Sequence, residues 1–121
     1  MTFQRKELGR KGEDMAAAYL KRCGYDIIER NFVNKLGELD IIAKDHNVLC
    51  FIEVKTRRTL AFGSPFESIT KRKQHKIIRV AESYLQYKNF YDVSIRFDCM
   101  AVYVQEEGED QIELIKGAFE A

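Results

Sequence analysis

Two apolar segments joined by a short turn, residues 37–45 and 48–55, restrict the fold of this chain more than any other feature. Both have the length and apolar content of a β-strand. The turn between them is centred on His46 and Asn47, and asparagine tolerates the positive φ that tight hairpins need. A loop of two or four residues at this point pairs residues whose numbers sum to 93. The sequence therefore predicts a β-hairpin of defined register.

Charged side chains gather at the open end of this hairpin. In that register Asp40 faces Glu53 and Glu38 faces Lys55, and the alternation of side chains along a strand puts all four on one face. The opposite face is expected to be wholly apolar, with Leu39, Ile41, Ala43, Val48, Cys50, Ile52 and Val54. Two carboxylates directly opposite each other repel, and a cation between them removes that cost. The pattern predicts a site for Mg²⁺ or Mn²⁺ at Asp40 and Glu53. The alternative is an ordinary Glu38–Lys55 ion pair at a solvated sheet end.

Length and charge indicate a single domain over residues 1–121, with its core at about 5–104 and an acidic extension over 105–121. The extension holds six acids and one base, whereas residues 1–104 hold 19 bases and 13 acids. The main body is therefore basic, which permits a polyanionic partner.

The three cysteines, Cys23, Cys50 and Cys99, are scattered through apolar patterns and fit neither a disulfide framework nor a zinc site. A reducing cytoplasm is the simplest location for such a chain. No apolar run is long enough to cross a membrane, so we expect no membrane partner.

The order of the remaining elements predicts an α/β fold with a mixed central sheet flanked by helices. In chain order the expected elements are a helix over 5–23, strands over 25–32, 37–45 and 48–55, a loop over 57–66, a helix over 68–88, and strands over 93–104 and 111–115. The third strand, the second helix and the fourth strand should form a right-handed βαβ unit. The second helix should then begin near the open end of the hairpin.

Each helix brings further chemistry to that end. In the first helix Asp14 is expected to point to solvent and Glu13 to lie on the flank of the apolar stripe. In the second helix Arg72, His75, Lys76 and Arg79 should share an outer face. The residues expected to bind nucleic acid are Arg57, Arg58, Lys71, Lys73, Gln74 and Lys76. The alternative for this basic set is a solvated helix face.

Six short stretches, in this order, carry a family resemblance: Lys11-Gly12-Glu13, Gly24-Tyr25, Arg30-Asn31, Gly37-Glu38-Leu39-Asp40, Phe51 to Arg57, and Phe62-Gly63. The chain resembles the PD-(D/E)XK nuclease superfamily, above all its Holliday-junction-resolvase-like members, and more narrowly the YraN-like family of uncharacterised bacterial proteins. The proline of the superfamily motif is absent before Gly37. The resemblance implies a restriction-endonuclease-like αβββαβ core.

The resemblance also implies roles for four residues. Glu13, Asp40, Glu53 and Lys55 would be catalytic, with Mg²⁺ or Mn²⁺ on Asp40 and Glu53, and with Glu13 reaching the metal directly or through water. Lys55 would orient or deprotonate the attacking water. The implied activity is that of a Mg²⁺-dependent endonuclease, structure-selective on DNA.

Two other functions remain open at this stage: a non-catalytic nucleic-acid-binding module that keeps the nuclease fold, and an interaction protein in which the acids only form ion pairs. The choice of DNA or RNA and the formation of a homodimer also remain open.

Overall fold

The computed structural model describes residues 2–58, 65–105 and 108–121. Part of the expected loop, the Phe62-Gly63 stretch, and the acids Glu106 and Glu107 lie outside the described residues. The elements in chain order are α1 (Thr2–Arg22), β1 (Asp26–Asn34), β2 (Gly37–Asp45), β3 (Val48–Arg57), the short 3₁₀ helix η1 (Pro65–Ser68), α2 (Lys71–Tyr87), β4 (Ser94–Tyr103) and β5 (Gln111–Phe119). This is the predicted order of helices and strands.

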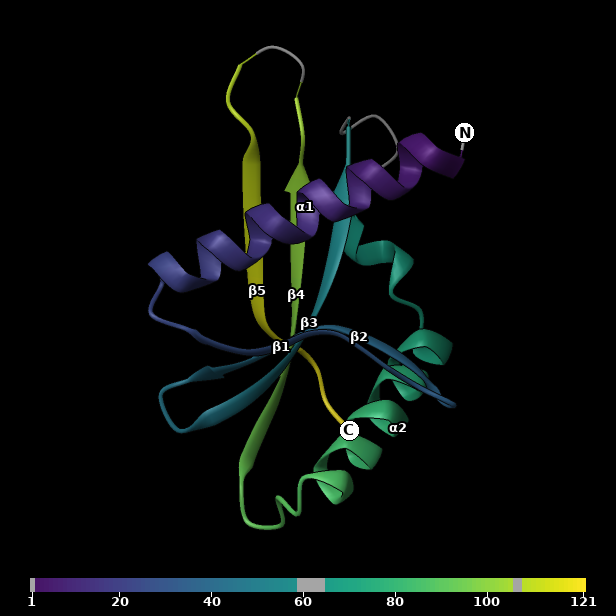
Figure 1. Ribbon diagram of the computed structural model, residues 1–121, viewed down its shortest axis with the longest axis vertical. Helices are drawn as coiled ribbons and strands as arrows, with labels where there is room; N and C mark the ends of the chain where they lie inside the picture. Colours follow the sequence, from purple (N-terminus) through teal and green to yellow (C-terminus); the bar gives the residue numbers. More distant parts are fainter. Residues whose placement is uncertain (1, 59–64, 106–107) are drawn as a thin grey trace.

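One mixed sheet carries the strands in the spatial order β1-β2-β3-β4-β5. Neighbouring strands are antiparallel except β3 and β4, which are parallel and are connected through α2. Figure 1 shows α1 crossing one face of the strongly twisted sheet, while α2 lies beside the β1–β2 end. The predicted α/β fold with a helix-flanked mixed sheet is confirmed.

Several expected boundaries shift by a few residues, among them the start of α1, which lies at Thr2, and the end of β1, which lies at Asn34. Two further differences, at α2 and β5, change how the fold is understood. Helix α2 begins at Lys71, after an N-cap at Thr70 whose side chain accepts a hydrogen bond from the Lys73 backbone at 3.3 Å. Ile69, which the expected helix over 68–88 includes, is buried but precedes α2, so its burial does not come from helical geometry. The last strand extends to Phe119 and pairs with β4 along most of its length. Residues 111–119 of the acidic extension are therefore part of the sheet.

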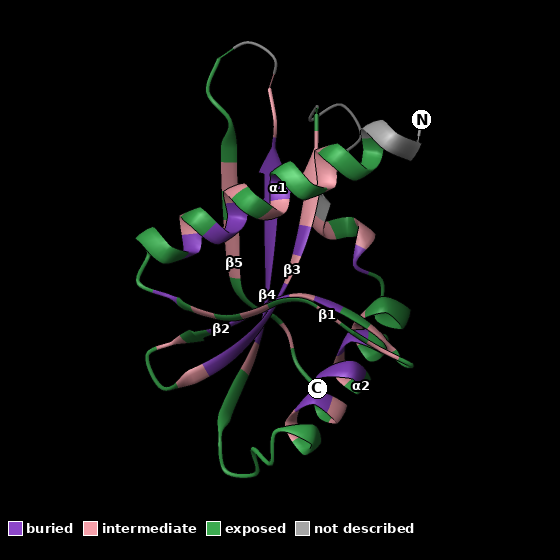
Figure 2. Ribbon diagram, viewed as in Figure 1, coloured by how far each residue is buried: buried purple, intermediate pink, exposed green. Residues whose placement is uncertain are grey.

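The core consists of two apolar clusters, one on each side of the sheet. Ala16 and Leu20 of α1 pack on Ile41, Ile52 and Met100. On the other side, α2 covers a second cluster formed by Leu39, Ile42, Leu49, Phe51, Ile77, Val80, Ala81, Tyr84 and Phe97. Figure 2 shows that burial is concentrated in the central strands and on the inner sides of the helices. Both helices thus use the apolar stripes that helical spacing predicts.

The predicted hairpin register is confirmed from its turn up to the pair Ile41 and Ile52. The left-handed residue in the turn is His46, with φ 57°, and not Asn47 as expected. Leu39 was assigned to the same face as Ile41, and this was wrong, because Leu39 packs with the cluster under α2. Strand β2 therefore loses its regular alternation at Asp40, which lies between these two residues.

The cysteines differ from the expectation at one position. Cys50 and Cys99 are buried free thiols, but Cys23, expected in the apolar stripe of the first helix, is exposed just after α1 ends. Gly24 then takes a φ of 92°, which glycine adopts readily and which ends the helix as predicted. None of the helices in the described ranges is long and apolar enough to span a bilayer.

Candidate functional site

The site forms where β2 and β3 separate. The ladder between them stops at the pair Ile41 and Ile52, so Asp40 has no ladder partner on β3. Instead, its Oδ2 accepts a hydrogen bond from the Val54 backbone N–H at 2.8 Å. The Asp40 carboxyl also shares a hydrogen bond with the carboxyl of Glu53. The structure thus joins the two acids that the register predicted to face each other, through their side chains and not through the ladder.

The pKa values of both acids reflect this arrangement. Burial, and then the charge of Glu53, raise the pKa of Asp40 to about 7. Burial likewise raises the pKa of Glu53, although Lys55 opposes the change. The hydrogen bond between the two carboxyls raises the pKa of Asp40 and lowers that of Glu53, so the two groups titrate together as a pair. At neutral pH this pair is stabilised by a proton or by a cation in its place.

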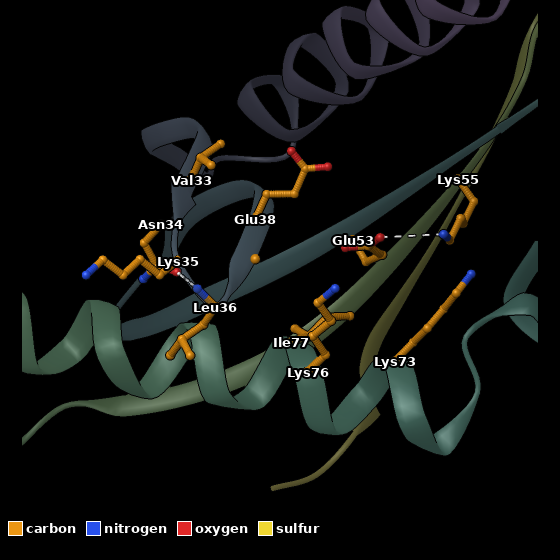
Figure 3. A pocket seen from close by; sticks show the side chains of 11 residues that line it. Val33, Asn34, Lys35, Leu36, Glu38, Glu53, Lys55, Lys73, Lys76 and Ile77 are labelled. Atoms are coloured by element: carbon orange, nitrogen blue, oxygen red, sulfur yellow. Dashed lines mark hydrogen bonds and ion pairs between the residues drawn. The ribbon is translucent and has the colours of Figure 1, made fainter.

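Lys55 lies beside the pair. Its Nζ is 3.5 Å from Glu53 Oε1, and the two side chains are only 18% and 19% exposed. The predicted register paired Lys55 with Glu38, and this was wrong, because the ammonium group of Lys55 pairs with Glu53. Figure 3 shows the Glu38 carboxylate directed towards α1, away from the Glu53–Lys55 pair. The loss of alternation in β2 accounts for this change of direction.

Glu13 reaches the site because α1 approaches β3 very closely. A Cβ placed on Gly12 would lie 2.6 Å from Thr56 Cγ2 and 2.8 Å from Thr56 Cβ, so only glycine fits without a shift. Glu13 is half-buried on the flank of the helix and Asp14 is exposed, as the sequence predicted. Asp14 binds Arg30 at 2.7 Å.

The side-chain amide nitrogen of Asn31 donates to the Glu13 carboxylate and lies 3.2 Å from each of its two oxygens. Burial and then the charge of Asp40 raise the pKa of Glu13, while Arg30 and Asn31 oppose them. Glu13 therefore interacts electrostatically with the central pair through the charge of Asp40. Asn31 belongs to one of the family stretches, but sequence reasoning assigned it no role in the site, and its left-handed φ of 55° was not visible in the strand pattern.

Of the three residues predicted to bind a divalent metal, Asp40 and Glu53 are suited to it. Within the described residues no group of three or more His, Cys, Asp or Glu side chains is arranged to hold a metal. Asp40 and Glu53 nevertheless present two poorly solvated carboxylates of the kind that Mg²⁺ and Mn²⁺ prefer. Asp40 and Glu53 would thus bind the ion, with Glu13 acting at longer range.

A groove of about 540 Å³ leads away from the acids between α2 and the β1–β2 turn. Glu53, Lys55, Lys73 and Lys76 line it on one side, and Figure 3 shows Lys73 and Lys76 rising from α2 beneath the acids. The predicted approach of the second helix to this end is therefore confirmed. Lys35, in the turn, also lines the groove and was missed by sequence reasoning.

The other residues expected to bind nucleic acid are placed differently. Arg57 lines a separate hollow of about 260 Å³ together with Arg5 and Lys55. Gln74 donates a hydrogen bond to the Ile69 carbonyl at 3.1 Å, so its amide is used in fixing the start of α2. Lys71 and Arg58 are exposed and are not among the residues that line the groove of the acids.

A third hollow, of about 740 Å³, opens on the α1 side of the acids. Lys6, Arg10 and Arg30 line it with Glu13, Asp14 and Glu38. Its positive and negative side chains are balanced, in contrast to the lysine-rich groove along α2. The Arg30-Asn31 stretch marked this region in the sequence, but the charges of α1 did not stand out from an ordinary solvated helix face.

Comparison with known proteins gives consistent matches along the chain. A sequence model of the uncharacterised protein family UPF0102 matches residues 12–102. A UPF0102 protein of Caldicellulosiruptor saccharolyticus is 49% identical over 118 residues, which cover 97% of this chain and all of the relative. A UPF0102 protein of Clostridium botulinum (strain Hall) is 47% identical over 99% of both chains. One of Geobacter sulfurreducens is 47% identical over 95% of this chain and 90% of its own.

Proposed function

The chain belongs to the uncharacterised protein family UPF0102, the YraN-like proteins, and we propose that it is a metal-dependent nuclease that hydrolyses phosphodiester bonds in nucleic acid. One observation carries the proposal: Asp40 and Glu53, two poorly solvated carboxyls with raised pKa values, lie beside Lys55 at the end of a lysine-lined groove. A structural ion pair would neutralise its acids, whereas here Lys55 pairs with Glu53 and Asp40 keeps a raised pKa beside them. Perturbed carboxyls in a cleft are typical of functional sites.

Each residue has a definite task in this proposal. Asp40 and Glu53 bind the cation, which would supply Lewis-acid activation of water and of the phosphate. Lys55 orients the attacking water and donates hydrogen bonds to the phosphate oxygens as their negative charge grows. Glu13, held by Asn31, adds negative charge on the α1 side of the pair. Lys73 and Lys76 bind the phosphates of the backbone without reading bases.

The proposal also covers partner and location. DNA is the proposed substrate, a cytoplasmic location agrees with the free thiols, and a homodimer would double the basic surface. The second candidate function is a non-catalytic nucleic-acid-binding module. It is favoured by the lack of a three-ligand metal cluster in the part of the chain that the structure describes.

Lys55→Ala tests the proposal. Wild-type protein with Mg²⁺ or Mn²⁺ should cleave at least one substrate in a panel of branched, flapped and single-stranded DNA and RNA. The variant should lose about 10²–10⁴ in rate, because a positioned acid–base group typically contributes that much. Its metal site should remain, since Asp40 and Glu53 are intact. NMR should therefore still show Mn²⁺ broadening the amide signals of residues 38–40 and 53–55 first.

Two controls accompany this test. Asp14→Asn should leave both cleavage and broadening unchanged, while Asp40→Asn should abolish both. Cleavage that survives in Lys55→Ala contradicts the assigned mechanism. If the wild type binds nucleic acid in a salt-dependent way but cleaves nothing, the non-catalytic module replaces the nuclease.

A further inference from the structure

The turn between β1 and β2 is fastened to α2. Asn34 Oδ1 accepts a hydrogen bond from the Leu36 backbone N–H at 2.9 Å, and Asn34 Nδ2 donates to Ser83 Oγ at 2.7 Å. Gly37 follows with a φ of 148°, and a Cβ on it would lie 3.2 Å from side-chain atoms of Lys76 and Val80. These contacts fasten the turn to the helix.

This fastened turn exposes apolar side chains beside a polar site. Val33 is 66% exposed and Leu36 is 41% exposed. Figure 3 shows the two side chains on different sides of the turn, with Leu36 directed towards α2. A single exposed apolar residue is ordinary, but two of them on a turn fixed at the entrance of a cationic groove suggest contact with a partner.

Leu36 also separates two cationic grooves. On one side of Leu36 lies the groove of the acids, whose lining includes Lys73. An outer groove of about 410 Å³ lies on the other side, lined by Leu36, Arg72, His75, Lys76 and Arg79, with no acidic side chain among these described residues. Leu36 and Lys76 line both grooves and thus form the partition between them.

We propose that this partition binds a nucleic-acid fork: Leu36 contacts the last base pair before two strands diverge, one strand enters the groove of the acids, and the other enters the outer groove. The inference rests on the proposed function and gives it a substrate class. Apolar side chains that insert at base steps unstack them, and cationic grooves bind the freed backbones. Fully paired duplex offers no opened step, so it should bind more weakly.

The test measures binding alone, by fluorescence anisotropy in EDTA, so that it does not depend on cleavage. The probes are a labelled DNA fork with two unpaired arms and a fully paired duplex of equal length. We expect the wild type to prefer the fork by roughly tenfold, since contact with an opened step adds on the order of one stacking interaction. Leu36→Ser should bring this ratio close to one, and Leu36→Met, which keeps an apolar side chain of similar size, should preserve it.

Two control variants separate the partition from general effects. Ile28→Ser removes an apolar side chain that is 44% exposed on the same strand pair, and the fork preference should persist. Arg79→Ala removes a charge of the outer groove only. It should weaken fork binding several-fold and lower the salt slope for the fork by about one, with little change for the duplex. Circular dichroism spectra establish that each variant is folded.

The following results would overturn the inference: equal binding of fork and duplex by the wild type, a fork preference that survives Leu36→Ser, or an equal loss from Ile28→Ser. These results leave the proposed function intact, because that function is judged by metal-dependent cleavage. Conversely, a protein that prefers forks through Leu36 but cleaves nothing supports the inference and removes the nuclease.

Discussion

Asp40 is a carboxyl that the fold holds near its midpoint of ionisation at neutral pH. Its hydrogen bond from Val54 favours the charged form, but burial and the neighbouring Glu53 outweigh it and raise the pKa to about 7. A carboxyl whose pKa rises on folding contributes stability below about pH 4, the pKa of the unfolded chain. That contribution is lost as the pH rises through 7.

The first prediction at this scale is that Asp40→Asn stabilises the metal-free protein at pH 8. The amide oxygen can still accept the Val54 N–H, and the repulsion with Glu53 disappears. We expect a gain of about 1–2 kcal/mol in the free energy of unfolding, or several degrees in Tm, after allowance for solvent screening. The gain should shrink at pH 5, where wild-type Asp40 is protonated. Thermal unfolding at both pH values measures it.

Asp92→Asn, at an exposed position outside the site, is the matched control and should show no such pH dependence. A lower stability of Asp40→Asn at pH 8 would contradict the electrostatic account of the pair.

At the residue scale, the sequence was sufficient to pair Asp40 with Glu53 because the turn fixes the register from the far end of the hairpin. It was not sufficient to predict the direction of Glu38, whose carboxylate points towards α1 and not towards Lys55. A hydrogen bond from the Val54 backbone to the Asp40 side chain replaces the next ladder step, and the alternation of β2 changes there. A side chain that competes with the backbone ladder leaves no trace in an alternating pattern.

At the scale of elements, α1 is positioned by one glycine. Gly12 lets the helix backbone approach Thr56 at the end of β3, and this approach places Glu13 beside the acids. Gly9 lies one turn earlier in the same helix, and a Cβ added there would meet no atom within 4 Å. Substitutions at the two glycines therefore distinguish the effect of close packing, present only at Gly12, from the effect of helix propensity, present at both.

We predict opposite effects of alanine at these two positions. Gly12→Ala should push α1 away from β3 and cost about 1–3 kcal/mol of stability, as overpacking of a close contact does. Gly9→Ala should stabilise the helix by about 0.5–1 kcal/mol, because glycine loses more backbone freedom on folding than alanine. Urea unfolding measures both. Similar effects of the two substitutions would mean that the contact with Thr56 does not limit the position of α1.

The sequence predicted the type and order of the helices and strands because the apolar periodicities are long and regular. Helix α2 begins three residues later than expected, because Thr70 caps it. Ile69 is buried like the apolar residues of the helix, although it lies before the helix begins. Strand β5 was expected to end at Ile115. Gly117 instead takes a φ of 64° at an irregularity, and the strand resumes beyond it.

At the scale of the whole molecule, one buried polar network joins distant parts of the chain. Asp98 is fully buried and accepts hydrogen bonds from Arg96 Nε at 2.7 Å and from the Gly117 backbone at 2.9 Å. Arg96 also donates to Tyr25 and to Asp45. The network thus connects β4 to β5, to the hairpin turn and to the segment after α1, on the face opposite the lysine-lined groove.

We predict that Asp98→Ala costs about 3–5 kcal/mol, because it leaves the Arg96 charge poorly solvated and without its buried partner. The double variant Arg96→Met with Asp98→Leu should cost less, about 1–3 kcal/mol, since it leaves no buried charge. The groups that mainly lose partners are the Gly117 N–H and the Tyr25 hydroxyl. Denaturant unfolding compares the two. A double variant as unstable as Asp98→Ala would indicate that the network contributes through more than the buried charge.

Sequence reasoning did not find this network. Arg96 and Asp98 sit two apart in a strand, which places them on one face, but nothing in the pattern shows that Tyr25 and Gly117 come to the same point. Those partners are about 70 residues and about 20 residues away in sequence. Contacts of this kind depend on the completed sheet order.

The parallel pairing of β3 with β4 has a consequence for the order of folding. Strands β1 to β3 are joined by tight turns, so they can pair through local contacts and bring Asp40 and Glu53 together early. Strand β4 pairs with β3 across a long sequence separation that includes α2, and such long-range closure is intrinsically slow. The acids therefore meet while still hydrated, and the repulsion between them becomes costly only in the last, slowest step. In the proposed nuclease, a divalent ion bound between the acids at that moment would lower the barrier to completing the fold.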